Sequence, residues 1–183
     1  MAYLLRSLLF LMMVSLFLTM GTALGWINIG FPHIELGITT FIFVIFIQAF
    51  IMFYFIGVAR LVENVYNALH STSNLSELFD EDQIPPDLTP YKEKVTRFVH
   101  ESALSKRQTI PWTMLMLILG TIGFLLGGAH DTGMVQKTTH SGVVYGFLAA
   151  VIIGFFKQWK YLGKSHTLLR DMKGLFGMSR DAM

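Results

Sequence analysis

The chain has 183 residues, about the length of one globular domain, yet 53% of them are hydrophobic and only 14% are charged. Soluble domains carry about 25% charged residues, so this composition excludes a typical water-soluble fold, and its high hydrophobicity excludes intrinsic disorder. The chain has no cysteine, which excludes disulfides and thiolate metal sites, and a net charge of +2 does not favour binding to nucleic acid. The sequence therefore predicts a protein of the lipid bilayer.

Four segments are long and apolar enough to cross a bilayer, which requires about 20 residues. They cover approximately residues 4–24, 38–58, 110–128 and 141–156. The first also resembles a signal peptide, but its end, Thr22-Ala23-Leu24-Gly25, is a weak cleavage site, so we expect a retained helix. We predict an all-α integral membrane protein, a single membrane domain over residues 1–183, with four transmembrane helices arranged as two hairpins.

The basic residues predict the orientation of these helices, because Lys and Arg near the ends of spans stay on the cytoplasmic side. Of the 14 Lys and Arg residues, all except Lys137 lie near the N-terminus, in the connector 59–109 or in the tail 157–183. We therefore expect a multi-pass protein of the cell (inner) membrane with both termini, the connector and the tail in the cytoplasm.

The connector carries helical signals at both of its ends. The second span continues with a helical pattern to His70, and residues 71–74 favour turns. An acidic, proline-containing stretch follows over residues 77–90. Thr89 and Pro90 then predict a new helix with Thr89 as its N-cap, and we expect Pro111 to break or kink the chain where it re-enters the bilayer.

Small residues let helices approach closely in lipid, where the hydrophobic effect does not drive their contact. Spans three and four contain such residues at helical spacing, and we predict that these pack the helices: Gly123, Gly127, Gly142, Gly146 and Gly154. They could instead form a face for a second copy or a partner subunit. In span two, Gln48 should hydrogen-bond a neighbouring helix, and the many aromatic residues are typical of a surface facing lipid or another subunit.

The polar residues on the predicted outer side form the one candidate site. They are His33, Glu35, His130, Asp131 and His140. Imidazole and carboxylate together suit a transition metal such as Zn, Cu or Fe, and two histidines could hold the iron of a haem b. The alternative is that the histidines only hydrogen-bond loop carbonyls. No catalytic residues can be assigned, and we do not expect an enzyme.

Three functions are compatible with these features. The first is a non-catalytic subunit or accessory protein of a larger membrane complex, which binds other membrane subunits or forms a homo-oligomer. The second is a haem- or metal-binding redox protein that uses His33, His130 and His140. The third follows from layout alone: a hairpin, a cytoplasmic segment and a hairpin resemble the flagellar and energy-transducing stator proteins. That resemblance implies an ion-channel subunit in which hydroxyls such as that of Thr121 line a pore.

Overall fold

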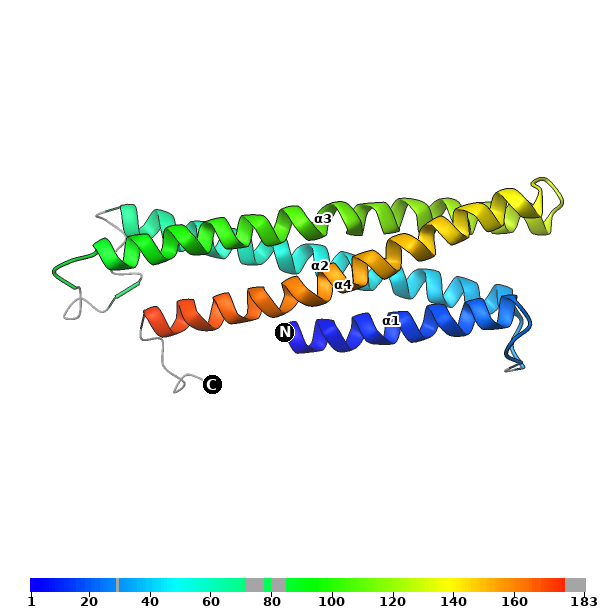
Figure 1. Ribbon diagram of the computed structural model, residues 1–183, viewed down its shortest axis with the longest axis horizontal. Helices are drawn as coiled ribbons and strands as arrows, with labels where there is room; N and C mark the ends of the chain where they lie inside the picture. Colours follow the sequence, from blue (N-terminus) through cyan, green and yellow to red (C-terminus); the bar gives the residue numbers. More distant parts are fainter. Residues whose placement is uncertain (29, 72–77, 80–84, 177–183) are drawn as a thin grey trace.

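A computed structural model describes residues 1–28, 30–71, 78–79 and 85–176, and these residues form four helices (Figure 1). The helices are α1 (Ala2–Ala23), α2 (His33–His70), α3 (Thr89–Asp131) and α4 (Lys137–Leu175). All four are long and apolar enough to cross a membrane. The chain is thus an all-helical, multi-pass membrane protein, as its composition predicts.

The four helices lie roughly parallel to one long axis (Figure 1). Helix α1 packs on α2 and α3 packs on α4, while α2 also packs on α3 and α1 on α4. The short connections 24–32 and 132–136 lie at the same end of the molecule, which we name the loop end. Toward the opposite end, α2, α3 and α4 continue well past the N-terminus of α1 (Figure 1).

Two apolar clusters follow one another along this axis. The first joins all four helices and contains fully buried side chains such as Leu9, Ile47 and Met116. The second lies beyond α1, in a part of the molecule that we name the extension, made of residues 58–70, 89–99 and 168–176. It is closed by the edge-on and tilted rings of Phe79, Tyr91 and Phe176. The extension therefore has a core of its own.

A buried polar network crosses the first cluster. Gln48, Gln158 and Thr113 are each 0% exposed. The Gln158 Nε2 donates to Gln48 Oε1 at 2.7 Å and to Thr113 Oγ1 at 2.8 Å, while Gln48 Nε2 lies 3.4 Å from the sulfur of Met12. The network thus contains one residue from each helix, and it confirms the prediction that Gln48 hydrogen-bonds a neighbouring helix. Gln158, its partner, was assigned by sequence to the tail.

Smaller polar contacts fasten α1 at both of its ends. Near the loop end, Thr40 Oγ1 of α2 lies 2.7 Å from both Ser15 Oγ and Thr19 Oγ1 of α1. Near the N-terminus, Arg6 Nη2 donates to the carbonyl of Trp159 at 2.9 Å, and the guanidinium lies 5.1 Å from the centre of the indole ring. Helix α1 is therefore held to α2 at one end and to α4 at the other.

The structure corrects two details of the expected connector. We expected a break or a kink at Pro111; helix α3 runs without interruption through this residue, so a break is wrong, while a kink stays a prediction. Proline removes one backbone hydrogen bond, but neighbouring helices can support such a helix, and here Thr113, two residues later, bonds to α4. The N-cap is Leu88 rather than Thr89. The Thr89 N–H donates to Asp87 Oδ1 at 2.9 Å, which lowers the pKa of that carboxyl.

The continuation of the second span is confirmed, because α2 is one helix of 38 residues that ends at His70. The tail beyond residue 156 also continues as α4 up to Leu175. Residues 77 and 80–84 of the acidic stretch 77–90, which include four of its five carboxylates, lie outside the described residues.

The glutamine pair predicts a strong energetic coupling. Gln158→Ala should lower the free energy of unfolding in detergent by about 1–3 kcal/mol, because it leaves buried polar groups on α2 and α3 without a partner. The double variant Gln48→Leu/Gln158→Leu should lose about 0.5–1.5 kcal/mol less than the sum of the losses in Gln48→Leu and Gln158→Leu, measured by thermal or denaturant unfolding. The control is Asn64→Leu on the exposed face of α2. Strictly additive single effects would contradict a coupled pair.

Candidate functional site

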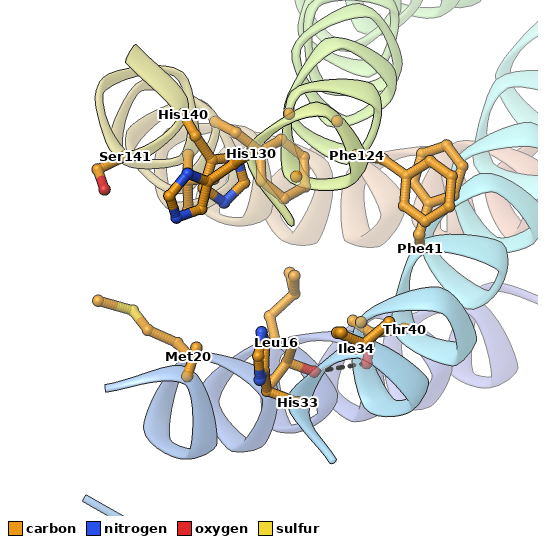
Figure 2. Close-up of a pocket in the computed structure, with 18 of the residues that line it drawn as sticks. Leu16, Met20, His33, Ile34, Thr40, Phe41, Phe124, His130, His140 and Ser141 are labelled. Carbon is orange, nitrogen blue, oxygen red and sulfur yellow. Dashed lines mark hydrogen bonds between the residues drawn. The ribbon is translucent and has the colours of Figure 1, made fainter. Parts of the chain in front are cut away.

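A cavity of about 600 Å³ lies at the loop end, between the pair α1–α2 and the pair α3–α4 (Figure 2). Its inner part is apolar, with Leu16 from α1, Phe41 and Val44 from α2, and Phe124 and Phe147 from α3 and α4. Phe41 and Phe124 stack with ring centres 4.5 Å apart and planes at 5°. This stack connects α2 to α3 and bounds the cavity on one side (Figure 2).

The mouth of the cavity is polar and contains four of the five predicted site residues. His33, His130, Asp131 and His140 all line it, and so does Lys137. His33 lies on one side of the opening, and His130 and His140 lie on the other (Figure 2). The fifth predicted residue, Glu35, is in the first turn of α2 but does not line the cavity. Four of the five predicted residues thus share one cavity whose inner part is apolar.

Helix ends bring these side chains together. His33 is the first residue of α2, His130 and Asp131 end α3, and Lys137 begins α4. The connection from α3 to α4 contains Gly133 at φ +76°, a conformation that residues with a side chain rarely adopt. The turn at this glycine is what places the end of α3 beside the start of α4.

His130 and His140 face each other with ring centres 6.0 Å apart and planes at 12°. His130 Nδ1 lies 3.1 Å from the carbonyl oxygen of Val135. Because a carbonyl only accepts, Nδ1 carries the proton of that bond, and Nε2 of the neutral ring is left as an acceptor. The Nδ1 of His140 is shielded from solvent and has no hydrogen-bond partner within the described chain. The two rings therefore present unused polar atoms.

The described residues contain no group of three or more His, Asp or Glu side chains placed to hold a metal ion. The histidines and Asp131 share a cavity without converging on one point. The metal or haem b interpretation of His33, Glu35, His130, Asp131 and His140 stays a prediction. What these residues can do as placed is donate and accept hydrogen bonds and, with Lys137, attract an anion.

The predicted packing glycines fall into two groups. An added Cβ would lie 3.8 Å from Val143 at Gly123, 3.3 Å from His140 at Gly127 and 2.7 Å from Met116 at Gly154, so these three lie against a neighbouring helix. A Cβ at Gly142 or Gly146 would meet nothing within 4 Å. Gly142 and Gly146 therefore lie on a face of α4 that points away from the rest of the described chain, which we name the outer face of α4.

Two features of this site could not be read from the sequence. The stack of Phe41 on Phe124 depends on α2 lying next to α3, which no sequence pattern reveals. Lys137 was noted only as the one basic residue on the predicted outer side. Its position at the mouth follows from the start of α4, four residues earlier than the predicted span.

Two alanine substitutions should distinguish a glycine that lies against a neighbouring helix, such as Gly120, from a glycine in an open position. Gly120→Ala places a Cβ 3.1 Å from Cε2 of Phe147, so we expect a loss of about 1–3 kcal/mol in the free energy of unfolding. Gly146→Ala should leave stability unchanged or raise it by up to about 1 kcal/mol, because the position is open and alanine favours a helix. Unfolding of the purified chain in one detergent measures both. An equal loss in both variants would contradict the structure.

Comparison with the models of known protein families, with curated protein sequences and with solved structures found no match to this chain. Its function has to be inferred from the cavity, the outer face of α4 and the distribution of charge.

Proposed function

We propose that this chain is a non-catalytic subunit or accessory protein of a larger membrane complex. In this proposal the four helices form two transmembrane hairpins in the inner membrane. Both termini and the extension lie in the cytoplasm, and the loop end lies on the outer side. The charge distribution supports this orientation, because all Lys and Arg residues except Lys137 then lie at the N-terminus, in the connector or in the tail.

The observation that carries the proposal is the outer face of α4. Gly142 and Gly146 are exposed there and are four residues apart, which is the spacing of small residues that lets a second helix approach closely in lipid. Large exposed side chains flank them, with Tyr145 at 56% and Ile153 at 44% exposure. Since a Cβ at either glycine meets nothing within 4 Å in the described part of the chain, we assign the pair to a helix of another subunit.

Two further surfaces fit a subunit. On α2, an exposed row of aromatic residues is formed by Phe46, Phe50 and Phe53, which are 57%, 53% and 64% exposed. Such a row suits lipid or a neighbouring subunit. The extension adds a polar surface with its own apolar core, which would give a cytoplasmic partner a fixed structure to bind. Its basic groups include Lys92, Arg97 and Arg170.

The orientation can be tested directly because the chain contains no cysteine. A single cysteine at Gln136, in the outer connection, should react in intact cells with a maleimide that does not cross the membrane. A single cysteine at Lys173, near the end of α4, should react only after the cells are opened. Labelling of both positions in intact cells, or of Lys173→Cys alone, would contradict the proposed topology.

The outer face of α4 can be tested by association. We expect the chain in mild detergent to co-purify with a stoichiometric partner or a second copy, and Gly142→Leu/Gly146→Leu should weaken that association at least tenfold, about 1.4 kcal/mol. The matched control is Gly57→Leu on α2, where an added Cβ also meets nothing within 4 Å. Native mass spectrometry reads both. A wild-type chain that is always alone and monomeric would refute the proposal.

The same preparation separates the two alternative functions. A Soret band or a stoichiometric metal that disappears in His130→Ala/His140→Ala would assign a redox role. Ion flux into liposomes above that of empty liposomes would assign a stator-type role. In the structure, Thr121, the expected pore hydroxyl, donates to the carbonyl of Leu117 in its own helix at 2.8 Å.

A further inference from the structure

The cavity at the loop end changes from apolar to polar along its length. Its inner part is lined by Leu16, Phe41 and Phe124, while its mouth carries Lys137 and the three histidines. In a membrane protein with this topology, the mouth lies at the level of the lipid headgroups and the inner part at the level of the acyl chains. We propose that the cavity binds one anionic phospholipid, with its phosphate at the mouth and an acyl chain between the two helix pairs.

The cavity has the size and access that such a ligand needs. Its volume of about 600 Å³ is within the range of roughly 300–1,000 Å³ that is typical of ligand sites. Four apolar residues that line it are also largely exposed: Ile34 at 48%, Ile38 at 42%, Leu125 at 64% and Tyr145 at 56%. These residues face the surrounding lipid, so a lipid can enter from the side without crossing water.

The hydrogen-bond donors at the mouth can bind an anion. Lys137 is a basic side chain, and His33 and His140 can each donate a hydrogen bond through a ring N–H. Asp131 is the one carboxylate among the residues that line the cavity. A basic group close to the membrane surface attracts anionic lipid by about 1 kcal/mol. Lys137 and Asp131 carry opposite charges, so the preference for an anion depends on the additional histidine donors and on the N–H groups at the starts of α2 and α4.

The backbone at the mouth is also asymmetric. Helices α2 and α4 both begin there, and within the described chain neither has a side-chain hydrogen bond at its N-cap. The carbonyl ends of α1 and α3 are closed by loop amides, because the N–H of Trp26 donates to Gly21 and the N–H of Met134 donates to Ala129. Within the described chain, the first turns of α2 and α4 thus offer N–H donors at the mouth, which suit phosphate oxygens.

This site goes beyond the proposed function, since a lone chain would bind the lipid as well as an assembled complex would. The experiment uses the full chain, purified in detergent and stripped of lipid, and measures binding by native mass spectrometry. The probes are phosphatidylglycerol, phosphatidylcholine with matched acyl chains, and inorganic phosphate. We expect one tightly bound phosphatidylglycerol, with at least fivefold weaker binding of phosphatidylcholine and no competition by millimolar phosphate.

Two variants locate the site. Lys137→Gln should weaken phosphatidylglycerol binding about fivefold, the equivalent of about 1 kcal/mol, and weaken phosphatidylcholine binding less, because choline offsets the charge of its phosphate. Its control is Lys173→Gln, at the opposite end of α4. Gly37→Leu should abolish binding of both lipids by filling the apolar part, because Gly37 lines the cavity and an added Cβ there meets nothing within 4 Å. Its control is Gly57→Leu, an open position on the same helix outside the cavity.

Four results would overturn the proposal. They are equal binding of the two lipids, displacement of the lipid by inorganic phosphate, wild-type binding by Gly37→Leu, and equal weakening by Lys137→Gln and Lys173→Gln. Since an added Cβ meets nothing within 4 Å at either position, we expect Gly37→Leu to match Gly57→Leu in helical content and unfolding temperature, which separates loss of the site from loss of the fold.

Discussion

The arrangement of the four helices depends on the buried bond between the amides of Gln48 and Gln158. In a medium without water, an unpaired amide costs several kcal/mol, so the two side chains must meet once the helices assemble. Thr113 takes the second hydrogen of Gln158, and Met12 packs on Gln48. Because one residue turns a helix by about 100°, a shift of α4 by a single residue would remove Gln158 from the network. The network thereby sets the register of all four helices at one level.

On either side of the glutamine network, different contacts hold α1 to its neighbours. Toward the N-terminus of α1, the contact of Arg6 with Trp159 and of Tyr3 with His166 holds α1 against α4. Toward the loop end, Thr40 bonds to hydroxyls of α1 instead, so that α1 stays with α2. The glycines of α3 that lie against α4 allow those two helices to pack closely. At the loop end α1 thus packs on α2 and α3 packs on α4. The stack of Phe41 on Phe124 joins the two pairs, and the space beside it is the cavity.

The helices could be predicted because twenty apolar residues in sequence have no stable alternative to a helix in lipid. The need of Gln48 for a partner could be predicted in the same way. The identity of Gln158 could not, because Lys157 precedes it and a lysine ordinarily marks the end of a span. Here the Lys157 ammonium donates to Gln108 at 2.9 Å, so its long side chain removes the charge from the core. The outward direction of Gly142 and Gly146 was also hidden, since a spacing of four residues places two glycines on one face without saying which face.

Lys137 connects the orientation of the chain to its cavity. In the proposed orientation Lys137 lies on the outer side, against the distribution of the other basic residues, and it begins a helix whose N-terminal dipole it repels. Neither the charge distribution nor the helix dipole favours a lysine at this position, and no carboxylate is bonded to Lys137 in the described chain. An anionic headgroup at the mouth would offset both unfavourable effects, because it would attract the ammonium and bond to the N–H groups at the start of the same helix. The residue that is least expected from the charge distribution is therefore the one that the proposed lipid best explains.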